Sequence, residues 1–204
     1  KMPVSIYKND IPENLDLGNE IAVDTETMGL KFARDRLCLV QIADGDGTAY
    51  LIQIEKNQKQ ARNLAKLMTD EKVVKIFHYA RFDVGVLYKN LNFMTNNIYC
   101  TKIASKLART FSQSHGLKNL VKEILSIDIS KEQQSSYWGT DVLDVNQINY
   151  AKQDVLYLHK IKEHLDSILK REDRYEVFEK TCRFLPTRCE LDHMGWEDVD
   201  PFSH

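Results

Sequence analysis

The chain has 204 residues, of which 43% are hydrophobic and 28% are charged, and this composition suits a globular protein that buries a core. Its formal net charge of −2 argues against a protein that holds long DNA or RNA by charge alone, because such proteins carry a basic stripe. No apolar run reaches membrane-spanning length and residues 1–16 lack the apolar core of a signal peptide, so we expect a cytoplasmic protein without a membrane partner.

The first half of the chain contains several short apolar segments. Those bounded by turn residues predict strands at residues 21–24, 37–43, 48–54, 73–77 and 98–100. The second and third of these strands are joined by the hairpin turn sequence Asp44-Gly45-Asp46-Gly47. Apolar residues at helical spacing predict a helix at residues 58–68, and a second helix is expected at residues 80–88.

The second half of the chain, from Thr101 onward, has the pattern of helices. Its clearest helix begins near Asp144, which can cap the first turn together with Gln147 three residues later. An apolar stripe continues that helix through Leu156, Ile161, Leu165 and Ile168. Sequential strands followed by alternating helices and strands predict an α/β fold, a mixed sheet flanked by helices. Without repeats or linkers, we expect one domain over residues 1–204.

Two carboxylates stand at strand spacing in the segment Val23-Asp24-Thr25-Glu26-Thr27. Residues i and i+2 of a strand point to the same face, so Asp24 and Glu26 should project together where the strand ends. Taken alone, such a pair is more often a solvated strand end or a helix cap.

Two later motifs add acidic residues. Asp83 closes the segment 77–83 and is expected at the start of a helix, where an acid alone could simply complement the helix dipole. Tyr150 and Asp154 lie four residues apart, so they share one face of a helix. By themselves they could be a core tyrosine and a surface acid.

The three motifs together indicate more than each does alone. Cleavage of a phosphodiester by two metals requires carboxylates that flank a pair of divalent ions about 4 Å apart. Converging acids destabilise a fold unless a cation offsets their repulsion. The coincidence of the motifs therefore predicts a two-metal nuclease site.

In this order the motifs resemble those of the DEDD 3′–5′ exonucleases, whose fold is ribonuclease H-like. Tyr150 is typical of the tyrosine subclass, because the histidine subclass carries His at the position of Asn149. The segments 36–42 and 134–138 resemble ribonuclease D. Many relatives have Asn where this chain has Tyr79, a departure that bears on substrate contacts and not on the metal ligands.

Two segments near the end of the sequence, 185–192 and 195–198, resemble nanoRNase C-like enzymes. These are ribonuclease D-like enzymes that cleave very short RNA, notably dinucleotides. The resemblance implies a homo-oligomer, an octamer. The tail at about residues 185–204 could form part of such an interface, because Trp196 and Phe202 must pack either on their own domain or on a neighbour.

The resemblance also implies roles for five candidate catalytic residues. The carboxylates expected to bind two divalent cations, Mg²⁺ or Mn²⁺, are Asp24, Glu26, Asp83 and Asp154. Tyr150 would orient the attacking water, since a phenol with an ordinary pKa of about 10 is a poor base at neutral pH.

Candidate substrate-binding residues adjoin the first two motifs. Met28 and Leu30 could wedge against a base while Gly29 lets the backbone turn, although all three could equally be core residues after a strand. His78 and Tyr79 could stack on a base, against the alternative of a buried structural pair. The polar segments 112–118 and 131–136 could supply donors to a terminal phosphate, or they could be ordinary connections between helices.

The sequence thus predicts a 3′–5′ exoribonuclease that hydrolyses short oligoribonucleotides, dinucleotides included, to 5′-mononucleotides. One alternative is a ribonuclease D-like exonuclease that trims longer RNA or DNA ends, which the near-neutral charge disfavours. Another is a non-catalytic nucleic-acid-binding module, which would be expected to lose motif acids, whereas all four are present.

Overall fold

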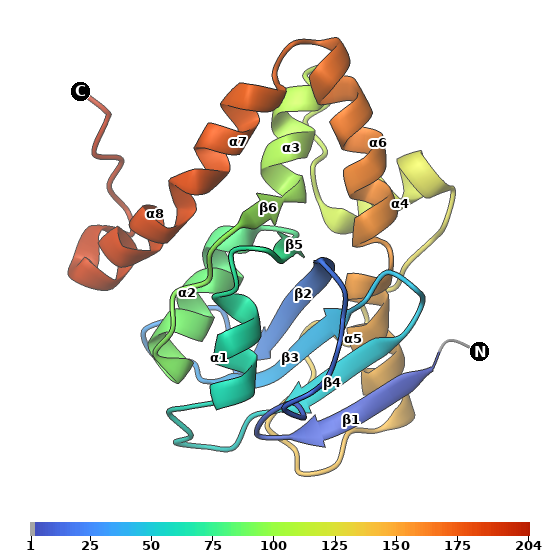
Figure 1. Ribbon diagram of the computed structural model, residues 1–204, viewed down its shortest axis with the longest axis vertical. Coiled ribbons are helices and arrows are strands. Elements are labelled where there is room, and N and C mark those ends of the chain that lie inside the picture. The colour runs from blue at the N-terminus through green and yellow to red at the C-terminus, as the bar shows by residue number, and fades with distance from the viewer. Residues whose placement is uncertain (1–2) are drawn as a thin grey trace.

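The computed structural model describes residues 3–204 and contains a mixed sheet. The strands are β1 (Val4–Lys8), β2 (Glu20–Thr27), β3 (Leu37–Ala43), β4 (Ala49–Gln53), β5 (Val74–Phe77) and β6 (Ile98–Cys100). They form one six-stranded sheet in the order β1-β4-β3-β2-β5-β6, in which β3 is antiparallel to both of its neighbours. The predicted α/β mixed sheet is confirmed (Figure 1).

Helices lie on both faces of this sheet. They are α1 (Arg62–Met68), α2 (Ala80–Leu91), α3 (Thr101–Ala108), α4 (Leu117–Leu125), α5 (Val145–Leu156), α6 (Leu158–Arg171), α7 (Tyr175–Arg183) and α8 (Leu185–Leu191), followed by a wider turn at Asp192–Trp196. In Figure 1, α5 lies behind the sheet and α1 lies in front of it. Helix α5 packs on β2, β3 and β4, whereas α2 packs on β2, β3, β5 and β6.

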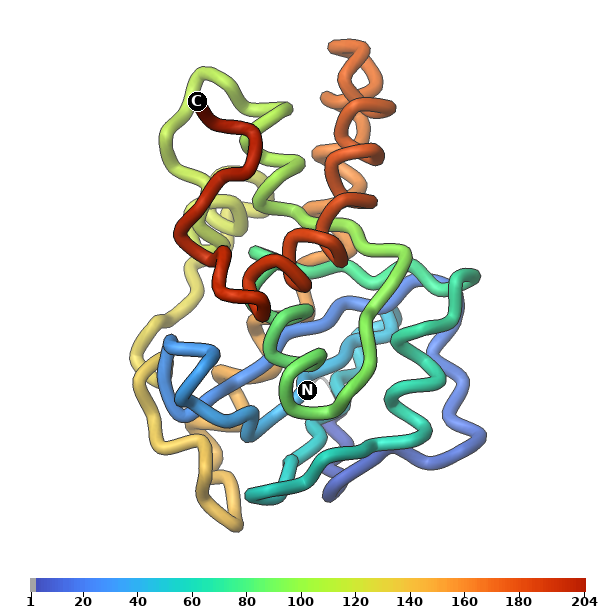
Figure 2. Tube along the Cα trace, turned by 90° about the vertical axis from the view of Figure 1, so that its left-hand side faces the viewer, coloured from blue at the N-terminus to red at the C-terminus, as the bar shows by residue number. Residues whose placement is uncertain are grey.

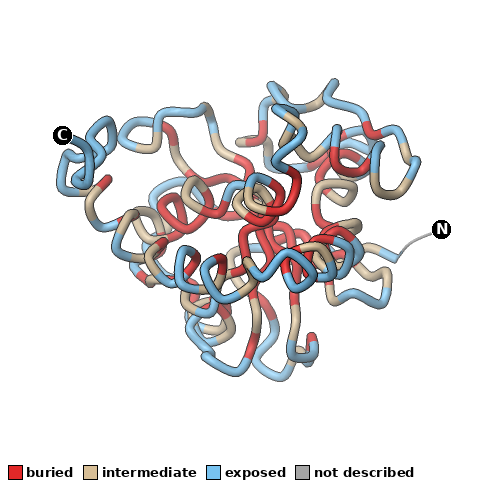
Figure 3. Tube along the Cα trace, turned by 90° about the horizontal axis from the view of Figure 1, so that it is seen from above, coloured by how far each residue is buried: buried red, intermediate tan, exposed pale blue. Residues whose placement is uncertain are grey.

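The core forms because the central strands are buried on both faces. Every residue of β3 is buried, which fits its nearly continuous apolar sequence. The larger core joins the sheet to α1, α2 and α6, and a smaller cluster, which includes Leu39 and Trp138, joins β3 and β4 to α5. Figure 3 shows the buried segments gathered inside a shell of exposed loops. Within residues 3–204 no helix is long and apolar enough to cross a membrane.

Strand β1 was not predicted from the sequence. It pairs in parallel with β4 at the edge of the sheet, a long-range contact that local patterning does not encode. The same region supplies a cap for α1. The carboxylate of Asp10 accepts hydrogen bonds from the backbone nitrogens of Asn63 and Leu64 at 2.9 and 2.8 Å. This tertiary cap explains why α1 begins at Arg62 and not at the predicted residue 58.

Two predictions for the second half were wrong. The helix that begins near Asp144 is not continuous, because the chain bends at Tyr157 between α5, which packs on the sheet, and α6, which packs against α3. Residues 126–144 are neither helix nor strand, although the chain from Thr101 onward was expected to be helical apart from connections such as 131–136. The predicted capping box is confirmed: the Asp144 carboxylate accepts from the Gln147 backbone, and the Gln147 side chain accepts from the Asp144 backbone.

Candidate active site

The floor of the candidate site is the end of β2. Alternation along that strand sends Asp24 and Glu26 to the face covered by α5, as the spacing predicted. Gln41 on β3 is paired with Asp24 in the register, and it is fully buried. Its side-chain amide donates to Asp24 Oδ2 at 3.4 Å and to Glu26 Oε1 at 3.3 Å. The neighbouring strand therefore orients both carboxylates.

Helix α5 brings the third motif to the same place. One carboxylate oxygen from each of Asp24, Glu26 and Asp154 lies within 4.8 Å of the other two. Tyr150 lies one turn before Asp154 on the same helix, and its ring packs against Trp138 with centroids 5.9 Å apart. The predicted convergence of the first and third motifs is therefore present in the structure.

Asp83 reaches the floor from the first turn of α2. It is buried, and its Oδ1 accepts a hydrogen bond from the Thr25 hydroxyl at 2.5 Å. Its carboxyl lies close enough to that of Asp24 for its charge to raise the pKa of Asp24. The residue that precedes α2 is Tyr79, which has a left-handed backbone with φ 70° and ψ 55°. This sharp turn from β5 into α2 places Asp83 beside β2.

Burial raises the pKa of all four acids, and repulsion between carboxylates adds to the shift in Asp24, Glu26 and Asp154. Burial raises the pKa of Asp24 and that of Glu26 well above their ordinary values, and nearby carboxylates raise both further. Burial, followed by the charge of Asp24, does the same to the pKa of Asp154. Burial also raises the pKa of Asp83 to about 7, although Thr25 opposes the shift. A cluster that resists full ionisation in this way would be stabilised by a cation.

The oxygen donors at this floor suit a hard divalent cation. Mg²⁺ and Mn²⁺ prefer carboxylate ligands. Asp24, Glu26 and Asp154 offer such a set within the reach of one ion, and Asp83 adjoins it through Asp24. The charge of a cation would also favour the ionised forms that burial disfavours.

Tyr150 has the properties of a neutral hydrogen-bond donor. Burial raises the pKa of its phenol above the ordinary value, and the charges of Asp154 and Glu26 raise it further. The hydroxyl therefore keeps its proton at physiological pH, so it can orient a water but cannot act as a base.

A cleft of about 870 Å³ opens above this floor. All ten residues predicted for the site line it: Asp24, Glu26, Met28, Gly29, Leu30, His78, Tyr79, Asp83, Tyr150 and Asp154. Further lining residues come from the long segment after α4, namely Ser130, Lys131, Gln134, Ser135 and Ser136. The segments at 112–118 and 131–136 also meet here, because Gly116, Leu117 and Lys118 line the same cleft.

The loop that follows β2 forms one lip of the cleft. Leu30 is 82% exposed and Met28 is 44% exposed, so the alternative that they are core residues is wrong. A side chain at Gly29 would clash, since its Cβ would lie 2.3 Å from Asp35 Oδ2. Asp35 in turn accepts from the Lys31 backbone nitrogen at 2.9 Å. Gly29 is thus required by the close packing of the loop on Asp35.

His78 and Tyr79 do not form the buried pair that was weighed as an alternative. His78 is half-buried, and its Nδ1 lies 2.9 Å from the Thr101 hydroxyl. Burial lowers the pKa of His78 to about 3, so its ring is neutral. Tyr79 is 47% exposed, and the Lys102 ammonium lies 4.5 Å from the centre of its ring.

Sequence reasoning missed several residues of this site. Gln41 was detectable as the one strongly polar side chain in an otherwise apolar strand. Thr25 had no local signal, because its partner Asp83 is distant in the sequence. Lys102, which lines the cleft, had none either, whereas Lys118 lies in the segment 112–118 that was considered as a source of donors to a phosphate. Helix α4 begins after Gly116 without a side-chain cap.

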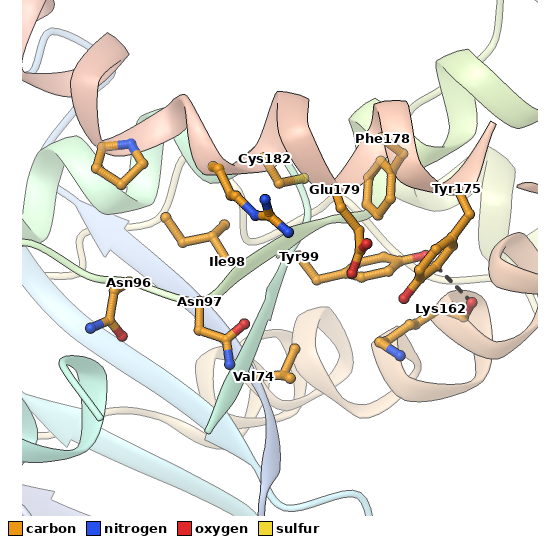
Figure 4. Close-up of a pocket in the computed structure, with 12 residues that line it drawn as sticks. Val74, Asn96, Asn97, Ile98, Tyr99, Lys162, Tyr175, Phe178, Glu179 and Cys182 are labelled. Atoms are coloured by element: carbon orange, nitrogen blue, oxygen red, sulfur yellow. Dashed lines mark hydrogen bonds between the residues drawn. The ribbon is translucent and has the colours of Figure 1, made fainter. Parts of the chain in front are cut away.

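A second groove lies away from the acidic floor, between β6 and α7 (Figure 4). It has a volume of about 360 Å³, and Tyr99, Tyr175 and Phe178 line it. The hydroxyl of Tyr99 donates to Asp166 at 2.8 Å, and Lys162 forms an ion pair with Asp166 at 3.0 Å. Tyr99 and Lys162 in this groove are therefore engaged in structural bonds, and none of the motif acids lines it.

The C-terminal segment is tied to α2, the helix that carries Asp83. Helix α8 packs against α2 (Figure 2). Arg81 donates to both carboxylate oxygens of Asp192, at 2.9 and 2.8 Å, and to the backbone carbonyl of Glu197 at 2.7 Å. Trp196 and Phe202 remain 46% and 79% exposed, so the packing of this segment on its own chain covers them only in part.

Comparison with known proteins places the chain in a family. Residues 7–170 match the family model described as 3′–5′ exonuclease. NrnC of Brucella melitensis is 49% identical over the full length of both chains, with a TM-score of 0.96, and it has also been solved with bound Mg²⁺ and bound to pGG. Ribonuclease D of a Jannaschia species is 30% identical over 163 residues, which are 78% of this chain and 42% of that protein.

More distant relatives share the fold. RNase D of Escherichia coli has a TM-score of 0.74 at 22% identity, over 89% of this chain and 48% of that one. The chain spans about two fifths of the length of the curated ribonuclease D relatives it matches. The motifs, the fold and these likenesses agree. The chain belongs to the 3′–5′ exonuclease family, in the ribonuclease D-like group that includes NrnC.

Proposed function

We propose that this protein is a metal-dependent 3′–5′ exoribonuclease that hydrolyses short oligoribonucleotides, dinucleotides included, to 5′-mononucleotides. One observation carries the proposal: the acids of three separate motifs meet at the floor of one cleft. The full-length likeness to NrnC supports it, because that protein has been solved with Mg²⁺ and with pGG.

The carboxylates would hold two divalent cations, Mg²⁺ or Mn²⁺. Asp24 is the best candidate to serve both, because it lies beside Glu26 and Asp154 and its pKa is raised by the charge of Asp83. When bound, the cations supply Lewis-acid activation of water and stabilisation of the leaving oxygen. Gln41 holds Asp24 and Glu26 in place through its amide, and the buried phenol of Tyr150 orients the attacking water.

The rim of the cleft would hold the substrate. The exposed side chains of Met28 and Leu30 can separate or cover bases, and the neutral ring of His78 and the ring of Tyr79 offer stacking surfaces. Lysines at three points of the lining, Lys102, Lys118 and Lys131, provide positive charge in the same cleft as the acids. A few phosphates can be recognised in this way without a basic surface outside the cleft.

Two alternatives make different demands. A ribonuclease D-like enzyme for longer RNA or DNA gains from every phosphate contact, and a net charge of −2 offers little for that. A non-catalytic binding module has no use for four converging acids, which cost stability when no cation is bound. We also propose a homo-oligomer, an octamer as the resemblance to nanoRNase C-like enzymes implies, in which a second copy covers the exposed Trp196 and Phe202.

The test compares release of mononucleotides from labelled RNA of graded length, with and without EDTA. We expect the highest kcat/KM for a 5′-phosphorylated dinucleotide, a lower value for its unphosphorylated twin, and complete loss of activity in EDTA. Equal cleavage of a seven-mer and a dinucleotide, with no effect of the phosphate, would favour the ribonuclease D-like alternative. Binding of RNA without any cleavage would favour the binding module.

A further inference from the structure

One wall of the cleft is built from irregular chain. Residues 130–136, here called the strap, belong to the segment 126–144, which is neither helix nor strand. Irregular segments of this length in compact domains usually serve a function. Within the strap, Lys131, Gln134 and Ser135 are exposed and line the cleft. A wall of this kind contributes to recognition only if something holds it at a fixed distance from the acids.

Gln153 holds the first residue of the strap. Its side-chain nitrogen donates to the Ser130 carbonyl at 2.7 Å, and its side-chain oxygen accepts from the Ser130 backbone nitrogen at 3.3 Å. One amide therefore satisfies both backbone groups of Ser130, as a neighbouring strand would do. Gln153 directly precedes Asp154 on α5, so the strap is attached beside a motif acid.

Gln147 holds the other end. It is 4% exposed, and its side-chain nitrogen donates to the Ser136 hydroxyl at 2.9 Å and to the Tyr137 carbonyl at 3.0 Å. Its side-chain oxygen is already used in the capping box with Asp144. Gln147 therefore also stabilises α5 through its capping box, whereas Gln153 takes no part in that cap.

Between these two ends the strap is braced only by its own turns. The Gln134 backbone nitrogen donates to the Lys131 carbonyl at 3.1 Å, and that of Ser136 donates to the Gln133 carbonyl at 3.0 Å. These local bonds shape the strap but do not fix its distance from the floor. That distance depends on Gln147 and Gln153, which flank Tyr150 and Asp154 on one helix.

We infer that Gln153 is a positioning residue for the substrate: its amide fixes the strap so that Lys131, Gln134 and Ser135 present their donors to a substrate phosphate. The inference rests on the proposed function, since it assigns this wall to the phosphate of a short oligoribonucleotide. Attachment to α5 matters because the same rigid helix carries the catalytic Tyr150 and Asp154. The helix thus sets the distance between the phosphate and the bond to be cleaved.

The test replaces Gln153 with methionine, which has a similar length but cannot bond to Ser130. Asn146→Met is the matched control, because Asn146 is an exposed residue of the same helix outside the cleft lining. KM and kcat are measured for a 5′-phosphorylated dinucleotide and its unphosphorylated twin. Hydrogen exchange at residues 130–136 and the melting temperature with and without Mg²⁺ are measured alongside.

We expect Gln153→Met to raise KM for the phosphorylated dinucleotide about tenfold and KM for its twin little, with kcat at saturation nearly unchanged. Exchange in the strap should accelerate, while the Mg²⁺-dependent rise in melting temperature should persist. Asn146→Met should match the wild type in every measurement.

Three results would overturn the inference. If the wild type prefers the phosphorylated substrate and Gln153→Met keeps that preference, Gln153 does not position the strap, although the proposed function stands. Equal losses for both substrates, with a lower melting temperature, would show a purely structural role. A wild-type enzyme indifferent to the phosphate would overturn both the inference and the short-substrate part of the proposed function.

Discussion

The floor and the rim of the cleft are built by different means. The floor, which consists of the four motif acids and Tyr150, stands on β2, α2 and α5, and its side chains are largely buried. The rim, which consists of Met28–Leu30 and the strap, is irregular and exposed, and hydrogen bonds to single side chains such as Asp35 and Gln153 hold it. Secondary structure thus places the groups proposed to take part in the reaction, and local polar contacts place the groups proposed to select the substrate.

The largest effect on activity is expected from replacing an acid of the floor. Asp24→Asn should lower kcat at least about 100-fold, or about 2.7 kcal/mol, because an amide is a poor cation ligand at the centre of the cluster. The fold should persist, and kcat of the variant is to be compared with that of Asp46→Asn, which alters an exposed acid in the β3–β4 turn. A purified Asp24→Asn enzyme that retains more than a few per cent of the wild-type rate would contradict the assignment.

The floor should also respond to cations as a unit. Mg²⁺ at about 100 times its Kd should raise the free energy of unfolding by about 2.7 kcal/mol, because it binds the folded state. A melting curve with and without Mg²⁺ measures this gain. Replacing both Asp24 and Asp83 with alanine should abolish it, and an unchanged gain in the double variant would place the cation elsewhere.

Without cations, the floor should make stability depend on pH. The pKa of Asp83 is raised to about 7 in the folded state, so between its ordinary value near 4 and pH 7 the folded protein holds a proton that the unfolded chain releases. The free energy of unfolding should therefore fall as pH rises through this window, by at most about 1.4 kcal/mol per pH unit for one proton.

Urea unfolding in EDTA at several pH values measures this slope. Asp83→Asn should have a shallower one, because its amide does not titrate. Parallel curves for the wild type and the variant would show that Asp83 does not hold the proton.

A milder change at the floor separates positioning from binding. Tyr150→Phe removes only a hydroxyl, so kcat should fall about tenfold, or about 1.4 kcal/mol, while KM and the Mg²⁺-dependent gain in melting temperature stay the same. Tyr7→Phe, at a partly buried position of β1 outside the cleft lining, is the control. Loss of Mg²⁺ binding in Tyr150→Phe would refute the role of orienting water.

The difference between floor and rim also explains what sequence analysis could reach. Asp24 with Glu26, and Tyr150 with Asp154, are related by the periods of a strand and a helix, so local spacing was enough to predict that each pair shares a face. The role of Gln41 was not predicted from the sequence, because it depends on the register between β2 and β3.

The structure of the rim could not be predicted from local sequence patterns, because it depends on long-range contacts. Gln153 and Ser130 are 23 residues apart, and the local sequence around either residue does not predict their contact. Local patterns did not predict the full extent of the irregular segment 126–144, of which only residues 131–136 were considered as a connection between helices, because composition does not distinguish a surface helix from a loop held by distant partners. Strand β1 was missed for the same reason, since its partner β4 lies some 45 residues further along the chain.

The left-handed backbone at Tyr79 implies that a substitution there can raise thermal stability and at the same time weaken substrate binding. A bulky residue in the left-handed conformation is strained, by about 1 to 2 kcal/mol, whereas asparagine adopts it more readily. Variants selected for heat resistance alone should therefore exchange Tyr79 for Asn, gaining a few degrees in melting temperature while KM for a dinucleotide rises as the stacking ring is lost. Persistence of Tyr79 under such selection would mean that its contact with Lys102 already offsets the strain.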